Sequence, residues 1–344
     1  MPDSPHGTSV TSDGAMDLAV TLAGQGPEQG PNPRVGCVIT DADGAVIAQG
    51  WHRGAGTPHA EVAALADARE RGVDVTGATA YVTLEPCNHT GRTGPCAEAL
   101  LHAGIGNVRY AVPDPGDASS GGAATLNAHG IDARLAPHDG ARELTRRWHR
   151  AVTQGRPYVI AKWAATLDGR MAAQDGTAFW ITGPEAREHA HHMRARVDAI
   201  AVGTVTVETD NPSLSARPGG TEQGPQPLRV VIGSRDTAGA AVWRDGNALA
   251  IRSHDPATVL AELHAREVRT LIVEGGPTVL SAFLAAGLVD EVNAYIAPAV
   301  LGDGPAAISG MGISTMTDAL RLTEVTHASM GADILVTGLV TEGT

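Results

Sequence analysis

The apolar positions in the first half of the chain fall into short β-branched runs, separated by longer segments with helical spacing. The runs VGCVIT (35–40) and AVIAQG (45–50) are joined by turn residues 41–44, so they predict two neighbouring strands. Further strands are predicted at 79–84 and 107–112, helices at 15–23, 59–71 and 96–103, and a helix leading to a short strand from residue 123 onward. Strands that alternate with helices predict a layered sheet with helices on its faces.

The second half repeats this alternation, although no internal repeat relates it to the first half. The Arg-rich segment 139–157 includes a helix containing Trp148 and ends in Gly-Arg-Pro, which predicts a domain boundary. Beyond it, strands are predicted in YVIAKWAA, DAIAVGTVTV, PLRVVIGS, NALAIR, TLIVEGG and EVNAYIAPAV. We therefore expect a flexible tail at 1–13, a first domain at 14–150 and a second α/β domain at 156–344.

Length and composition agree with two globular domains and exclude several classes of protein. The chain has 344 residues, of which 42% are hydrophobic and 18% charged, enough for two cores. A net charge of −13 argues against nucleic-acid partners, because phosphate backbones bind basic surfaces. No apolar run approaches the ~18 residues of a membrane span, and the polar N-terminus does not resemble a signal peptide. We expect a cytoplasmic protein without membrane partners, in which local arginines can still hold a small phosphorylated substrate.

The strongest chemical signal is His59 and Glu61 in a His-Ala-Glu triplet, followed by Cys87 in a Pro-Cys pair and by Cys96. One imidazole and two thiolates form a set of three zinc ligands that leaves a fourth position for water. Zinc lowers the pKa of such a water towards ~7. Glu61 lies two residues beyond His59 and is not a ligand, so it is free to transfer protons. This pattern is typical of zinc nucleobase deaminases.

Three features of the cysteine pattern leave alternatives open. Cys87 and Cys96 are separated by eight residues, whereas the general deaminase signature has two. His89, in this insert, is an alternative metal ligand, and Cys37 is interpreted as a packing residue in a strand. A closed structural zinc site is the competing hypothesis, against which the lack of a fourth protein ligand and the presence of Glu61 both count.

At this point the sequence resembles a known family, the bifunctional deaminase–reductases of riboflavin biosynthesis. The resemblance covers nearly the whole chain after the tail, and the long insert between the two cysteines is a feature of that family. The matching segments are PNPRVGCVI (31–39), GWHRGAGTPHAE (50–61), TAYVTLEPCNHTGRTGPC (79–96), KWAATLDGR (162–170), WITGPEAR (180–187), TVETDNPSL (206–214), LRVVIGSR (228–235), VEGGPTVLSAFL (273–284) and LVDEVNAYIAP (288–298).

The resemblance implies a cytidine-deaminase-like αβα layered domain followed by a dihydrofolate-reductase-like α/β domain. It implies two successive reactions. Zinc-dependent hydrolytic deamination of 2,5-diamino-6-(5-phosphoribosylamino)pyrimidin-4-one comes first, and NADPH-dependent reduction of the ribosyl group of the aminouracil product to ribityl follows. The implied cofactors are Zn²⁺ and NADPH, the implied partner is a small phosphorylated pyrimidine, and the implied assembly is a homo-oligomer, a dimer or tetramer.

The family's site residues transfer to matching positions of this chain. His59, Cys87 and Cys96 are implied as zinc ligands and Glu61 as the proton shuttle. The implied NADPH site consists of Ala164, Trp180, Thr206, Asp210, Ser234, Gly276, Pro277 and Thr278. The implied substrate contacts are Asn32 in the first domain and Arg194, Leu214, Arg217 and Glu274 in the second.

The second half, taken by itself, offers weaker signals. The VEGG strand that leads into a helix exposes backbone N–H groups suited to a phosphate, but there is no G-x-G-x-x-G fingerprint of a Rossmann domain. Lys162 and Asp210 are candidates to polarise the ribose oxygens, and Asp168 lies on the segment near the expected hydride path. Arg235 is a candidate partner for the 2′-phosphate of NADPH.

Two positions depart from the family pattern. Relatives carry Asp-Pro-Asn-Pro and a Gly-Lys-Gly-like stretch where this chain has Asp-Pro-Gly-Asp and Ser-Ser-Gly-Gly within 114–124, and Ala178 stands where relatives often have Ser. The altered segment is expected to border the deaminase pocket. It therefore keeps open an alternative in which only one domain is active, or the enzyme acts on a related specialised pyrimidine.

Overall fold

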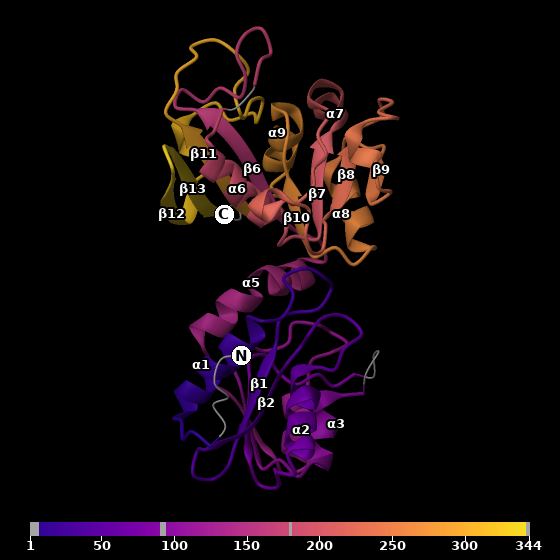
Figure 1. Cartoon of the computed structure of the whole chain (residues 1–344), viewed down its shortest axis with the longest axis vertical. Helices are drawn as coiled ribbons and strands as arrows, with labels where there is room; N and C mark the ends of the chain where they lie inside the picture. Colours follow the sequence, from indigo (N-terminus) through magenta and orange to yellow (C-terminus); the bar gives the residue numbers. More distant parts are fainter. Residues whose placement is uncertain (1–6, 90–93, 179–180, 342–344) are drawn as a thin grey trace. The chain divides into compact units, whose positions relative to one another are not determined.

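A computed structural model describes residues 7–89, 94–178 and 181–341 of the chain, which divides into two units, Met1–Gln154 and Gly155–Thr344 (Figure 1). The division lies within the interval 150–156 left between the two domains expected from the sequence. No helix in the described ranges is long and apolar enough to cross a membrane.

The first unit is built on one mixed sheet. Its elements are α1 (Ser12–Ala23), β1 (Gly36–Thr40), β2 (Val46–Trp51), α2 (Ala60–Glu70), β3 (Thr79–Val82), α3 (Cys96–His102), β4 (Asn107–Tyr110), α4 (Gly122–Ala128), β5 (Asp132–Leu135) and α5 (Asp139–Gln154). The strand order is β2-β1-β3-β4-β5; β1 is antiparallel to both neighbours, while β3, β4 and β5 are parallel.

Two glycines on neighbouring strands let helices pack closely on opposite faces of this sheet. Gly36 and Cys37 are consecutive in β1, so they face opposite sides, and Cys37 pairs directly with Gly50 of β2. A Cβ on Gly36 would collide with the backbone of α1, and a Cβ on Gly50 with the backbone of α2. α5 lies beside α1, and α3 lies beside α2 (Figure 1), which gives the three αβα layers expected for this unit.

The beginning of the chain is more ordered than the sequence predicts. Thr11 caps α1 by accepting the backbone N–H of Gly14 at 3.1 Å, so the helix starts at Ser12 rather than at residue 15. Ser9 forms a β-bridge with Ala45. The prediction of a flexible tail over 1–13 is therefore wrong for residues 8–13, because capping and strand pairing hold them on the sheet.

The second unit contains a larger sheet. Its elements are β6 (Tyr158–Thr166), α6 (Pro184–Arg194), β7 (Ala199–Gly203), α7 (Thr204–Asp210), β8 (Leu228–Ile232), β9 (Ala248–Ile251), α8 (Pro256–His264), β10 (Thr270–Val273), α9 (Pro277–Ala285), β11 (Glu291–Ala297), β12 (Leu322–Met330) and β13 (Asp333–Val340), with short 3₁₀ turns at Pro218–Gly220, Ala241–Trp243 and Met316–Asp318. The order is β12-β13-β11-β6-β10-β7-β8-β9, parallel from β11 to β9.

Two parts of this unit differ from the sequence prediction. The run DAIAVGTVTV is not one strand, because β7 ends at Gly203 and α7 starts at Thr204. The β-branched residues of α7 favour a strand, but they lie beyond the carboxyl end of β7, where, within the described residues, the chain has no neighbouring strand to pair with and forms a helix. The antiparallel hairpin β12–β13 was not predicted, since β12 is exposed along most of its length and has no apolar alternation.

A buried ion pair fastens the first strand of the second unit. Arg156 donates two hydrogen bonds to the Asp290 carboxylate, at 2.7 and 3.0 Å, and the same carboxylate accepts the backbone N–H of Val159 at 2.8 Å. Asp290 is buried, and β11 begins at the next residue. The pair therefore joins the start of β6 to the start of β11, its parallel neighbour.

Replacing Gly50 by alanine tests the close packing of α2. The added Cβ meets the backbone of Ala64, which cannot rotate away, so α2 must shift. We expect a loss of about 1–3 kcal/mol in the free energy of unfolding. Amide hydrogen exchange across 60–70 should speed up. The control is Gly94→Ala, where a Cβ meets nothing within 4 Å. Unchanged protection of α2 in Gly50→Ala would contradict the packing argument.

Candidate functional sites

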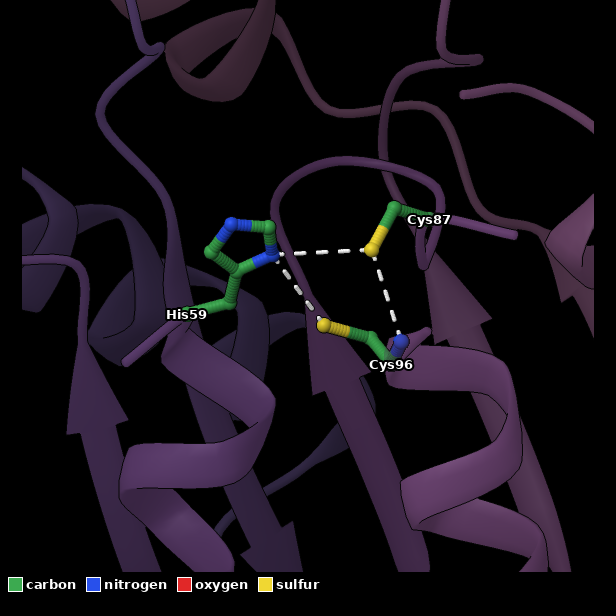
Figure 2. A group of neighbouring side chains, drawn as sticks. All are labelled: His59, Cys87 and Cys96. Atoms are coloured by element: carbon green, nitrogen blue, oxygen red, sulfur yellow. Dashed lines mark hydrogen bonds between the residues drawn. The ribbon is translucent and has the colours of Figure 1, made fainter. Parts of the chain in front are cut away.

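Three side chains with metal-binding atoms converge at the N-terminal ends of two helices (Figure 2). His59 is the N-cap residue of α2, Cys96 is the first residue of α3, and Cys87 lies in the loop after β3. The His59 Nδ1 atom is 3.5 Å from the Cys87 sulfur and 3.3 Å from the Cys96 sulfur. All three atoms lie within 4.8 Å of one another, and His89 is not part of the group.

The residues just before Cys87 are held in place by contacts with the 114–123 segment. A Cβ on Gly122, at the start of α4, would collide with the Pro86 carbonyl, so only glycine allows this approach. The Glu85 carboxylate accepts the backbone N–H groups of Asp114 at 3.2 Å and Ala123 at 3.1 Å. Residues 85–86, which lead into Cys87, are therefore held against the 114–123 segment.

The electrostatics of the group suit a divalent cation with thiolate ligands. Hydrogen bonding from Cys96, opposed by burial, lowers the pKa of Cys87 to about 4. The same pairing, together with burial, raises the pKa of Cys96. The Cys96 backbone N–H also points to the Cys87 sulfur at 3.4 Å, and the positive ends of α2 and α3 favour negative charge here. One imidazole and two sulfurs at these separations fit a tetrahedral zinc ion.

Glu61 lies in the first turn of α2, two residues beyond His59. Its side chain is buried, with 3% exposure. Burial raises the pKa of Glu61 to about 7; the negative charge on Cys87 acts in the same direction and His59 opposes it. A buried carboxyl group with a raised pKa is suited to accept and release a proton, as a general acid and base requires.

Asn32 is connected to His59 through His52, a residue that the sequence pattern did not single out. The buried ring of His52 lies edge-on to His59, with 5.4 Å between ring centroids. Burial lowers the pKa of His52, and its Nδ1–H donates to the Pro58 carbonyl at 3.1 Å, so Nε2 is an acceptor. The Asn32 amide nitrogen lies 3.0 Å from that Nε2 and must be its donor. The amide orientation of Asn32 is therefore fixed.

The segment that departs from the family pattern also borders this site. The Asp114 carboxylate accepts the Gly116 N–H at 2.9 Å, and a Cβ at Gly116 would collide with the Ser119 hydroxyl. The Ser119 carbonyl accepts the N–H of Asn88, the residue after Cys87. Ser119 thus fills the space where a side chain at position 116 would lie. Cys37, by contrast, is fully buried in β1 and outside the metal group.

In the second unit, glycines collect at the carboxyl ends of three parallel strands. Gly203 ends β7, Gly233 follows β8 and Gly275 follows β10; the last two have φ of 122° and 116°. The Thr206 hydroxyl accepts the Gly276 N–H at 3.1 Å, immediately before α9 starts. The carboxyl edge of a parallel sheet, with helix N-termini beside it, is a general site for phosphorylated ligands. The absence of side chains at Gly203, Gly233 and Gly275 lets Val279, Thr204 and Thr206 pack closely against this edge.

The other expected cofactor residues are spread around this edge. Ala164 lies in β6 opposite Tyr295, Asp210 ends α7, and Ser234 follows Gly233. Pro277 and Thr278 form the first turn of α9. Trp180 lies outside the described residues.

A cavity of about 240 Å³ lies next to the carboxyl half of β6 and carries several cationic side chains. It is lined by Lys162, Thr182, Ala186, Arg187, Ala190, His191, Arg194, Arg217 and Tyr295. Of these, Arg194 and Arg217 were expected as substrate contacts, whereas Arg187 and His191 were not singled out. An anionic ligand such as a phosphate fits this wall.

Two expected substrate contacts do not line the cavity. Leu214 has a left-handed backbone (φ 54°) and packs in an apolar cluster with Val207 and Val242. Glu274 is buried behind the cavity, where it accepts hydrogen bonds from Arg194 at 3.0 and 2.8 Å and from Lys162 at 3.5 Å. Burial raises the pKa of Glu274, but the two cations outweigh it and bring it to about 2. Glu274 therefore acts here as the counter-ion that orders both cations.

Asp168 and Arg235 are engaged with neighbouring protein groups. The Asp168 carboxylate accepts the Thr166 hydroxyl at 2.6 Å and the N–H groups of Leu301 and Gly302, which lowers its pKa to about 2. Asp168 thus anchors the loop after β11. Arg235 is exposed and pairs with Glu208 of α7 at 2.8 Å.

Both halves of the chain match models of known protein families. The "Cytidine and deoxycytidylate deaminase zinc-binding region" matches residues 10–112, and the "RibD C-terminal domain" matches residues 157–336. A Mycobacterium tuberculosis riboflavin biosynthesis protein RibD is 43% identical over 312 residues, 89% of this chain and 90% of that protein. The Corynebacterium ammoniagenes protein of the same name is 44% identical, over 85% of this chain and 87% of that protein.

Solved structures agree with these matches over both units. Acinetobacter baumannii RibD, form 1, is 34% identical with a TM-score of 0.87, covering 96% of this chain and 99% of that one. A diaminohydroxyphosphoribosylaminopyrimidine deaminase/5-amino-6-(5-phosphoribosylamino)uracil reductase from Thermotoga maritima is 31% identical with a TM-score of 0.85, with the same two coverages, 96% and 99%.

The ion-pair network around Glu274 predicts how stability changes with pH. The folded-state pKa of about 2 lies below the ordinary value of 4.5, so the carboxylate's contribution is present above pH 4.5 and lost as pH falls towards 2. Glu274→Gln should therefore destabilise the protein at pH 6 by about 3–5 kcal/mol, because two cations lose their partner. At pH 3 the difference from the parent protein should shrink.

Denaturant unfolding at the two pH values measures this effect. Glu262→Gln is the control, since Glu262 forms a surface ion pair with Arg266 and its loss should cost less than about 1 kcal/mol at either pH. A Glu274→Gln deficit that stays constant between pH 6 and pH 3 would refute the assignment.

Proposed function

The chain belongs to the RibD family and is a bifunctional deaminase and reductase of riboflavin biosynthesis, and we propose that each activity resides in one of the two units described above. The deaminase site is assigned to the first unit, 14–150 in the sequence, and the reductase site to the second, 156–344. The observation that carries the proposal is the His59–Cys87–Cys96 group with Glu61 buried beside it.

In the first unit, we assign His59, Cys87 and Cys96 as the zinc ligands. Zinc bound there activates water for attack at neutral pH. As water adds to the ring carbon that bears the amino group, Glu61, buried in the first turn of α2, would accept a proton from the water and donate it to the amino group, which would leave as ammonia. Burial keeps the Glu61 carboxyl away from bulk water, so that its proton moves between reacting atoms.

Asn32 is assigned to hold the pyrimidine in this site. Because His52 accepts a hydrogen bond from the amide nitrogen, the amide oxygen of Asn32 is the atom offered to a ring N–H. His52 therefore sets the donor and acceptor pattern that Asn32 presents to the substrate.

In the second unit, we assign the carboxyl edge of the parallel strands to NADPH, which supplies the hydride. The assigned cofactor residues are Ala164, Trp180, Thr206, Asp210, Ser234, Gly276, Pro277 and Thr278. Arg194 and Arg217 face the 240 Å³ cavity and are assigned to the ribose phosphate of the substrate. Lys162 lies between this cavity and Glu274, where its ammonium can polarise a ribose oxygen. Leu214 and Glu274 are also assigned to the substrate site, where Glu274 accepts hydrogen bonds from Arg194 and Lys162.

The remaining assignments follow from family membership and from the chain's charge. The substrate is a small phosphorylated pyrimidine, and neither nucleic acid nor membrane is a partner. We further infer a cytoplasmic location and a homo-oligomer, a dimer or tetramer. The 114–124 segment, in which Ser119 packs closely against Gly116, keeps one alternative open: only one domain is active, or the enzyme acts on a related specialised pyrimidine.

A coupled assay tests the proposal as a whole. Purified zinc-loaded protein is given 2,5-diamino-6-(5-phosphoribosylamino)pyrimidin-4-one with and without NADPH. Deamination without NADPH, followed by NADPH-dependent formation of the ribityl product, is expected. Zinc near one per chain with reduction but no deamination would support the alternative.

Replacing Glu61 by glutamine separates proton transfer from metal binding. We expect the deaminase kcat to fall by about 10²–10⁴-fold, with zinc content and reductase kinetics unchanged. Glu98→Gln is a matched control, because Glu98 is also two residues beyond a ligand in a first helical turn but is exposed. An equal loss in both variants, or loss of zinc from Glu61→Gln, would count against the assigned role.

Arg235 provides a test of cofactor selectivity. Its guanidinium is exposed just beyond the end of β8. Arg235 directly follows Ser234, an assigned cofactor residue, so its side chain is a candidate to bind the 2′-phosphate. Arg235→Ala should raise the KM for NADPH about 10-fold and leave the KM for NADH unchanged; Arg244→Ala, another exposed arginine, should change neither. Steady-state reductase kinetics with both cofactors measure this, and parallel changes for NADPH and NADH would exclude a phosphate contact.

A further inference from the structure

A tryptophan far along the chain holds the loop that carries Asn32. The indole N–H of Trp148, in α5, donates to the backbone carbonyl of Pro31 at 3.0 Å. The two residues are 117 positions apart in sequence. Trp148 is half-buried against the core of the first unit, so its ring is fixed by packing before it donates.

The Pro31 carbonyl belongs to the peptide unit that continues into Asn32. Because a peptide unit is planar, a hydrogen bond to this oxygen also fixes the direction in which the Asn32 Cα leaves it. Prolines at 31 and 33 flank Asn32 and contribute no N–H donors, so the backbone here depends on its carbonyl groups for anchoring.

Asn32 is thus held from two sides by two different elements. His52, which follows β2, accepts a hydrogen bond from the side-chain amide at 3.0 Å, and Trp148 in α5 donates one to the backbone carbonyl of the preceding residue. The His52 contact sets the rotation of the amide group. The Trp148 contact sets the position from which that amide projects.

We propose that Trp148 is a positioning residue of the deaminase reaction, acting through the Pro31–Asn32 peptide on the Asn32 amide that binds the pyrimidine. The proposal rests on the assignment of Asn32 to the pyrimidine. It predicts an effect on substrate binding and not on the chemical step, because Asn32 meets a part of the ring that the ground state and the transition state share.

Trp148→Phe keeps an aromatic ring in the core and removes only the N–H donor. In the zinc-loaded full chain, we expect the deaminase KM to rise about 3–10-fold, the range expected for one neutral hydrogen bond. The deaminase kcat should stay within about 2-fold, and zinc content and both reductase constants should not change.

The chain offers a matched control in its other unit. The Trp243 indole N–H donates to the Thr237 carbonyl at 2.9 Å, so Trp243→Phe removes a bond of the same kind. Trp243→Phe should leave the deaminase KM unchanged. A kcat loss or zinc loss in Trp148→Phe would show a general structural defect and overturn the proposal, as would an unchanged KM.

The double variant Asn32→Ala/Trp148→Phe tests whether Trp148 acts through Asn32. If it does, Trp148→Phe adds less than about 2-fold to the KM of Asn32→Ala, since the residue being positioned is gone. Multiplying effects would overturn the proposal while leaving the Asn32 assignment standing. An unchanged KM in Asn32→Ala alone would instead refute the Asn32 assignment, and the proposal with it.

Discussion

The candidate metal site of the first unit requires that one imidazole and two sulfurs be held close together. Such a group is costly to assemble, because burial disfavours the thiolates that a metal needs. Negative charge on the sulfurs is stabilised by two helix N-termini, one at His59 and one at Cys96, and by the backbone N–H of Cys96 that faces the Cys87 sulfur. Close packing at Gly50 and Gly122 keeps α2 and the Cys87 loop in place. Glu61 and Asn32 can then be placed relative to a fixed centre.

The sequence predicted most of what local pattern determines. Alternating strands and helices and the two-unit organisation were visible in the sequence. So were the three residues whose metal-binding atoms the structure brings together, and the family resemblance is confirmed by relatives of 43% and 44% identity. His52 and Trp148 were missed as site residues because their roles come from contacts 20 and 117 positions away. The helix at Thr204–Asp210 was missed because its β-branched residues favour a strand, while its position beyond the sheet edge decides for a helix.

In the second unit, two acidic residues that the sequence singled out are engaged with neighbouring protein groups. Glu274 was expected to touch the substrate, yet it lies behind Arg194 and Lys162 and accepts hydrogen bonds from both. An anionic substrate would be repelled by a bare carboxylate, but here the carboxylate is already neutralised and leaves the wall cationic. Asp168 has likewise become a loop anchor. In both cases an acidic side chain orders other groups.

The ion pair between Arg156 and Asp290 has a consequence for how this protein can be divided. Both partners lie in the second unit, and Arg156 is only the second residue of it. A polypeptide that starts at Gly155 retains the clamp that joins the first strand of its sheet to β11, whereas one that starts two residues later loses it. A second unit produced alone, or fused to another protein, should therefore include Arg156, because its guanidinium forms the ion pair with Asp290.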